Sequence, residues 1–205
     1  MLLKKLEVGP FSANCYLVGC PQSREAVIID PGAEGELIIE QVHRLELKVK
    51  CIINTHAHID HVGANGKVKG AFNVPLYIQE ADLPLFRSPQ ASVTLLSGRD
   101  EIAVPDQFVR DGDEINVGTL TVKVLETPGH TPGGITLEIN GALFTGDTLF
   151  AGSIGRTDFP GGSYRQIIKS IKSKILTYPD ETQIFPGHGP PTTVGNERRY
   201  NPFLS

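Results

Sequence analysis

The chain has 205 residues, of which 40% are hydrophobic and 20% charged, and its formal net charge is −4. This composition is ordinary for a globular protein, and the length allows one domain with a substantial core. The acidic balance argues against nucleic acid as the main partner, because phosphate binding normally needs a basic surface. No apolar run approaches the length of a membrane span, so we also expect no membrane partner.

The cysteines and the N-terminal sequence predict a cytoplasmic protein. Cys15, Cys20 and Cys51 are odd in number and form no C-x-x-C pair. We interpret them as small buried residues of a reducing compartment and expect no disulfide framework. Residues 1–7 become charged at once and contain no apolar segment of the kind that directs export.

The first half of the chain alternates short apolar runs with turns. These runs predict strands at residues 2–8, 14–18, 26–29, 49–53 and 75–78. Residues 34–47 carry apolar side chains at helical spacing, and Asp60 is placed to begin a second helix that continues through Val68. Residues 81–105 have a weak pattern interrupted by prolines, and a lid over a site is one interpretation of them.

The second half is rich in strand patterns. We expect strands at residues 114–117, 120–125, 135–139, 142–144 and 183–185, with a hairpin turn at Asn140-Gly141. Residues 164–176 form an amphipathic helical pattern, and residues 197–203 read as a short tail. Two β-rich halves with accompanying helices predict the α+β class, with two sheets packed face to face and helices outside, in a single domain spanning residues 1–205.

A cluster of potential metal ligands directly follows the predicted strand 49–53. It contains His56, His58, Asp60 and His61, which include three of the six histidines of the chain. In an extended loop His56 and His58 can point the same way, because alternate residues share a side. Asp60 and His61 are adjacent and project differently. One metal would use some of these groups, whereas two neighbouring metals would use all of them.

Three further candidates lie downstream, each in or after a turn. His130 is in a Gly/Pro-rich turn, Asp147 follows the predicted strand 142–144, and His188 follows strand 183–185. This mixed set of imidazoles and carboxylates suits zinc, iron or manganese better than thiolate-rich structural zinc or oxygen-only calcium. Alone, Asp60 would be a helix N-cap and His130 a turn residue, but the joint occurrence favours a metal centre.

The order of these motifs resembles the metallo-β-lactamase-fold hydrolases, and within them the glyoxalase II group. The matching stretches are H-x-H-x-D-H at 56–61, T-P-G-H-T-P-G at 127–133, T-G-D-T-L-F at 145–150 and P-G-H-G at 186–189. The resemblance covers nearly the whole chain and implies a four-layer αββα sandwich with a dinuclear site at one edge. It assigns His56, His58 and His130 to the first metal, Asp60, His61 and His188 to the second, and Asp147 to a bridge between them.

This resemblance implies a hydrolase of small-molecule thioesters such as S-lactoylglutathione. Two divalent cations would make water reactive near neutral pH, with zinc as the first choice of metal and iron or manganese as alternatives. Asp60 would also orient the nucleophile or accept its proton. Arg156 falls where related enzymes meet a glutathione carboxylate. However, Asp158 stands where they carry a tyrosine, and the alternative for Arg156 is a salt bridge that stiffens its loop.

A second departure concerns the C-terminal side. The well-studied glyoxalase II enzymes have a helical C-terminal domain, and this chain ends soon after His188. It is therefore similar to the compact bacterial type, and the thiol part of the substrate and the oligomeric state stay open. Asp30, after strand 26–29, is a candidate partner for a metal-bound imidazole, because such rings commonly donate to a carboxylate. A turn residue before Pro31 is the alternative interpretation of Asp30.

The main alternative function is that of a persulfide dioxygenase. That family is also similar to this chain, including the Gly-Arg-Thr-Asp-Phe stretch at 155–159, and the resemblance implies a mononuclear iron held by His56, His130 and Asp147. The complete second set of ligands favours the hydrolases. A β-lactamase fits less well, because the exported zinc lactamases generally place a cysteine where Asp147 lies.

Overall fold

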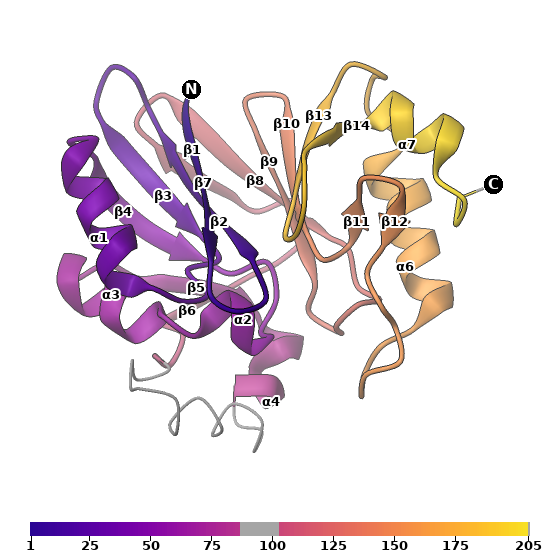
Figure 1. Cartoon of the computed structure of the whole chain (residues 1–205), viewed down its shortest axis with the longest axis horizontal. Helices are drawn as coiled ribbons and strands as arrows, with labels where there is room; N and C mark the ends of the chain where they lie inside the picture. Colours follow the sequence, from indigo (N-terminus) through magenta and orange to yellow (C-terminus); the bar gives the residue numbers. More distant parts are fainter. Residues whose placement is uncertain (87–102, 205) are drawn as a thin grey trace.

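The computed structural model describes residues 1–86 and 103–204. Two six-stranded sheets face each other (Figure 1). The first sheet follows the chain and contains β1 (Leu2–Val8), β2 (Ala13–Gly19), β3 (Glu25–Ile29), β4 (Lys48–Ile53), β5 (Leu76–Gln79) and β6 (Gln107–Val109). The second has the order β14-β13-β10-β9-β8-β7 and contains β7 (Glu114–Val117), β8 (Leu120–Glu126), β9 (Ile135–Ile139), β10 (Ala142–Gly146), β13 (Gln183–Pro186) and β14 (Thr192–Thr193).

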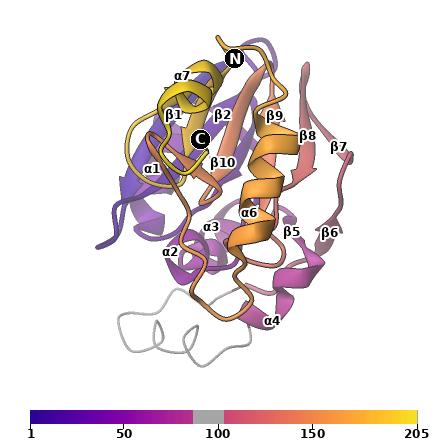
Figure 2. The ribbon, with the colours of Figure 1, turned by 90° about the vertical axis from the view of Figure 1, so that its right-hand side faces the viewer.

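Helices cover the outer face of each sheet. Helices α1 (Gly35–Arg44) and α3 (Asn65–Phe72) pack on the first sheet, and α6 (Tyr164–Ser170), its continuation Ile171–Ile175 and α7 (Val194–Tyr200) pack on the second (Figures 1 and 2). Shorter elements are α2 (Ile59–Val62), the 3₁₀ turn η1 (Glu80–Asp82), α4 (Leu83–Phe86) and a hairpin of β11 (Leu149–Phe150) and β12 (Ser153–Ile154). The predicted αββα sandwich is confirmed.

Strand periodicity divides the apolar side chains among three layers of core. In β2, Tyr16 and Val18 point into the core between the two sheets, whereas Cys15 and Leu17 point to α1 and α3. Successive strand residues face opposite sides, so a strand covered on both faces must be apolar throughout. A third core lies between the second sheet and α6. Each fully buried Leu or Ile contributes roughly 1.5–3 kcal/mol to this packing.

The predicted helix from Asp60 through Val68 is wrong as a single element. The structure has two short helices, α2 and α3, with a break at Gly63-Ala64. The break has a long-range cause, because the Ala64 N–H donates to the carbonyl of Pro31 at 2.9 Å instead of continuing the helical ladder.

The remaining predicted strands and helices are present, with ends shifted by a few residues. Strands β6, β11, β12 and β14 and helix α7 were not predicted. The predicted tail at 197–203 is therefore largely the last helix. Most of the suggested lid at 81–105 lies outside the described residues. Among the helices that are described, none is both long and apolar enough to cross a membrane.

Candidate metal centre

The predicted ligands all come from segments that follow strands. His56 and His58 follow β4, and Asp60 and His61 lie in α2 directly after them. His130 follows β8, Asp147 follows β10, and His188 follows β13. Strands β8, β10 and β13 run in one direction, because β10 pairs parallel with β13 and each of β8 and β10 pairs antiparallel with β9. Their carboxyl ends therefore deliver all three side chains to the same edge.

The two sheets are joined directly at this edge. The Ile135 N–H donates to the Thr55 carbonyl at 2.8 Å, and the Asn14 N–H donates to the Gly187 carbonyl at 2.7 Å. Each bond joins one sheet to a segment of the other. The ligands from the two halves of the chain therefore keep a fixed separation.

The first group of candidate ligands is His56, His58 and His130, with ring nitrogens within 4.8 Å of one another. His58 Nδ1 lies 2.8 Å from His130 Nε2. His56 Nε2 is buried and has no hydrogen-bond partner among the described residues. Buried polar atoms are almost always paired. A cation that accepts these nitrogen lone pairs would satisfy them, so the donor set fits a metal.

The second group is Asp60, His61 and His188. His188 Nε2 lies 3.2 Å from Asp60 Oδ2 and 3.2 Å from His61 Nε2. One carboxylate and two imidazoles converge here, which is a set that suits zinc, iron or manganese. The structure thus brings together the three side chains that the resemblance assigns to the second metal.

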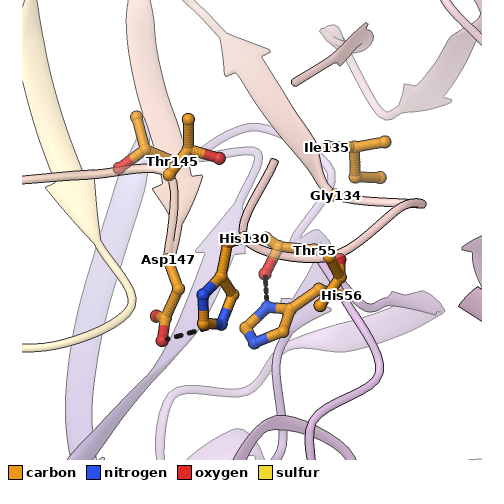
Figure 3. A pocket seen from close by; sticks show the side chains of 9 residues that line it. Thr55, His56, His130, Gly134, Ile135, Thr145 and Asp147 are labelled. Carbon is orange, nitrogen blue, oxygen red and sulfur yellow. Dashed lines mark hydrogen bonds and ion pairs between the residues drawn. The ribbon is translucent and has the colours of Figure 1, made fainter. Parts of the chain in front are cut away.

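Asp147 lies between the two groups. Its carboxylate lies 3.6 Å from His130 Nε2 (Figure 3). It also lies 3.4 Å from His61 Nε2 and 3.5 Å from His188 Nε2. Oδ1 is buried without a hydrogen-bond partner in the part of the chain that is described. This position suits a carboxylate that would bridge two cations.

The backbone around Asp147 leaves no room for added side chains. A Cβ on Gly187 would lie 2.2 Å from Asp147 Oδ1 and 2.8 Å from His61 Cε1. Glycine at position 187 therefore allows the chain after β13 to pass directly behind these two ligands.

Hydrogen bonds to carbonyl oxygens fix the tautomers of two imidazoles. His130 Nδ1 lies 2.7 Å from the carbonyl of Arg156, and His188 Nδ1 lies 3.1 Å from that of Phe11. A carbonyl only accepts, so Nδ1 must carry the proton in each ring. In the neutral ring, the lone pair of Nε2 is then directed at the site, as a metal ligand requires.

Asp30 fixes two further imidazoles. Its Oδ2 lies 3.0 Å from His61 Nδ1 and accepts from the Thr55 hydroxyl at 2.6 Å. The Thr55 oxygen can in turn accept from His56 Nδ1, 3.1 Å away (Figure 3). The structure thus confirms that Asp30 contacts a ligand ring. Thr55 was missed, because a hydroxyl before a histidine motif has no distinctive spacing.

The first group is in the protonation state that metal binding needs. Burial, followed by repulsion from neighbouring imidazoles, lowers the pKa of His56 well below its ordinary value. Burial and His130 lower the pKa of His58 to about 4, and burial is also the main cause that lowers the pKa of His130 to about 4. These rings are neutral at pH 7, and neutral imidazole is the ligand form.

The second group attracts positive charge. Burial alone would raise the pKa of Asp60, but hydrogen bonding by His188 and the charge of His61 lower it to about 2. Burial alone would lower the pKa of His61, whereas the carboxylates of Asp147 and Asp30 raise it to about 9. The same carboxylates would favour a cation in place of that proton.

The predicted substrate residue Arg156 lies beside this centre on the exposed rim. Its Nε and Nη2 donate to Asp158 at 2.8 and 2.7 Å. Its guanidinium also covers the ring of Phe159 at 3.9 Å, and that ring lies 5.4 Å from the ring of His58. The salt bridge considered as the alternative is therefore present, and a role in substrate binding stays a prediction.

A family model described as the metallo-beta-lactamase superfamily matches residues 8–188. The chain is 39% identical over 210 residues to hydroxyacylglutathione hydrolase GloC of Haemophilus influenzae, with 100% of this chain and 99% of the relative covered.

Solved structures agree with this family match. The BLEG-1 B3 metallo-beta-lactamase superposes with a TM-score of 0.91 at 37% identity and covers 100% of both chains. TTHA1623 in a di-iron-bound form has a TM-score of 0.87 at 36% identity, covering 98% of this chain and 100% of that one. ETHE1 from Myxococcus xanthus has a TM-score of 0.84 at 31% identity, covering 98% and 84%. The fold, the ligand cluster and these likenesses together place the chain in the metallo-β-lactamase superfamily.

Proposed function

We propose that the chain hydrolyses thioesters of small thiols, such as S-lactoylglutathione, with two divalent cations at the site. The observation that carries the proposal is Asp147, which lies within 3.6 Å of ligand nitrogens from both groups. The likeness to GloC, which is named as a hydroxyacylglutathione hydrolase, supports this choice of substrate. Zinc is the proposed metal, and the di-iron form of TTHA1623 supports iron as the alternative.

His56, His58 and His130 would hold the first cation and Asp60, His61 and His188 the second, with Asp147 shared. Such a pair supplies a hydroxide near neutral pH and polarises the carbonyl under attack. Asp60 is ionised, since its pKa is lowered to about 2 by His188 and His61 despite burial. It can therefore orient the nucleophile or accept its proton. The thiolate of a thioester leaves readily, so less acid assistance is needed than for an amide.

His58→Ala is expected to lower metal content and thioester hydrolysis together. The substitution removes one of three ligands from the first group, so that group no longer closes around a cation. The measurements are elemental analysis of the purified protein and the rate of thiol release. His43→Ala is the matched control, because His43 lies in α1 beside Phe72 and belongs to neither ligand group. Unchanged metal stoichiometry in His58→Ala would count against the assignment.

Arg156 is proposed to bind a carboxylate of the thiol part, and its partner Asp158 gives a way to test this. Arg156→Ala is expected to raise KM for S-lactoylglutathione by up to about fivefold, the range of an exposed ion pair of about 1 kcal/mol. Asp158→Asn should lower KM or leave it unchanged, because it releases the guanidinium. If the ion pair only stiffens the loop, both substitutions will change KM in the same direction.

A persulfide dioxygenase is the second candidate. His56, His130 and Asp147 line one pocket together (Figure 3), and these are the residues that a mononuclear iron would use on that reading. Oxygen uptake by an iron-loaded sample with glutathione persulfide tests this candidate. A β-lactam substrate belongs in the same assay series, because BLEG-1 is named as a B3 metallo-beta-lactamase.

The decisive experiment for the first proposal combines elemental analysis with a release assay on S-lactoylglutathione. We expect two metal equivalents per chain and thiol release that stops when a chelator removes them. A fully metallated protein that releases no thiol would overturn the proposed substrate and favour oxygen chemistry or another thioester.

A further inference from the structure

A carboxylate outside the ligand set joins the two loops that carry the first group of histidines. Asp82 is the last residue of η1 and is fully buried. Its Oδ2 accepts from the Ala57 N–H at 3.0 Å, and its Oδ1 accepts from the Gly133 N–H at 2.6 Å. Ala57 stands between His56 and His58, and Gly133 closes the turn that contains His130.

The Asp82 contact matters for the two loops because neither has regular structure. Residues 54–58 and 127–134 contain no helix or strand, so no ladder of backbone bonds fixes their direction. The Ala57 and Gly133 N–H groups need acceptors, since buried unpaired N–H groups are rare. One carboxylate supplies both acceptors and thereby adds a second link between the loops, beside the bond from the Ile135 N–H to the Thr55 carbonyl.

The close approach of η1 supports the same interpretation. A Cβ on Gly133 would lie 2.7 Å from the Asp82 backbone nitrogen and 2.8 Å from Oδ1. Glycine at this position therefore lets the turn reach the carboxylate. The anchoring of η1 itself does not involve the metal ligands, because Gln79 caps it by accepting from the Ala81 N–H at 2.6 Å.

We propose that Asp82 is a positioning residue for the first metal, holding His56, His58 and His130 at their mutual separation. The proposal rests on the metal centre proposed above and not on the identity of the substrate. Among the described residues, the hydrogen bonds of Asp82 go to Ala57 and Gly133 and not to the second group of ligands. Its loss should therefore affect one of two metal equivalents.

The test measures metal affinity in Asp82→Asn and Gly133→Ala, with zinc titrated against a competing chelator. Asparagine keeps the volume of aspartate but offers only one acceptor oxygen, so its NH₂ group must face one of the two N–H donors. Alanine at position 133 pushes the turn away from η1. We expect one equivalent to bind roughly 10–100-fold more weakly in both variants, the range for losing an outer hydrogen-bond partner of a ligand.

Two controls match these changes. Asp106→Asn also replaces a carboxylate that accepts a hydrogen bond from a backbone N–H. The donor is Leu76, at 2.7 Å, and neither residue belongs to the ligand loops. Gly70→Ala adds a Cβ in α3, where nothing lies within 4 Å. Both controls should bind two equivalents with wild-type affinity.

Cobalt spectra identify the weakened site. The cobalt-loaded variants should lose the absorption bands that His58→Ala loses and keep those that His188→Ala loses.

The stability of the metal-free proteins to denaturant is measured in parallel. Lower stability with wild-type affinity for both equivalents would show that Asp82 only supports the fold. Equal weakening of both equivalents would also overturn the proposal. If Asp82→Asn does not fold, the metal affinities and stability of Gly133→Ala are compared with those of Gly70→Ala, and the same outcomes decide. Absence of thioester hydrolysis in the wild type would leave these metal measurements unaffected.

Discussion

Asp147→Asn is expected to reduce the affinity for both metal equivalents and to lower thioester hydrolysis by more than about 100-fold, beyond the range for losing an outer partner. The carboxylate lies between the two ligand groups, 3.6 Å from His130 and 3.4 Å from His61. Asparagine keeps the volume but removes the negative charge and one of two acceptor oxygens. Metal content by elemental analysis and the rate of thiol release measure the two effects.

The control for this prediction is Asp113→Asn. Asp113 accepts from the Arg110 N–H at 2.8 Å on the exposed surface, away from the metal centre. We expect wild-type metal content and rate in the control. Two tightly bound equivalents in Asp147→Asn would show that the carboxylate is not shared between the sites.

His188→Ala is the second prediction with a large effect, and it separates the two candidate functions. For a dinuclear hydrolase, the substitution removes a ligand of the second site only. One equivalent should be lost and thiol release should fall by more than about 100-fold. For a dioxygenase with one iron on His56, His130 and Asp147, metal content and oxygen uptake should change little.

The fold should tolerate this substitution, because His188 lies partly exposed after the end of β13. His43→Ala again serves as the control for loss of an imidazole. If His188→Ala loses oxygen uptake but keeps thiol release, both assignments are contradicted. The dinuclear hydrolase predicts that thiol release falls, and the mononuclear dioxygenase predicts that oxygen uptake is kept.

The sequence predicted the αββα class because each signal for it is local. Alternating or continuous apolar runs define strands, and spacing near 3.6 defines the helices at 35–44 and 164–170. The candidate ligands also follow the C-terminal ends of strands, as the sequence pattern predicted. Strands β6 and β14, with three and two residues, escaped prediction because their pairing depends on neighbours distant along the chain.

The break between α2 and α3 shows the same limit inside a helix. The residues after Asp60 have helical spacing, yet the Ala64 N–H bonds to the Pro31 carbonyl 33 positions earlier in the chain (64 − 31 = 33). No pattern within residues 59–68 contains this contact. Propensity is a weak prior that a tertiary hydrogen bond overrides.

The sequence by itself determined which side chains can bind metal, because imidazoles and carboxylates are defined by residue type and their motifs occur in order. Only the tertiary structure decided which ring nitrogen faces the site and what holds the loops. Asp30 and Asp82 show the reason. Each carboxylate acts on segments 25 or more positions away, at 2.6–3.0 Å. Such distances arise only when strands pair within the first sheet and, for the contact of Asp82 with Gly133, when the two sheets pack together.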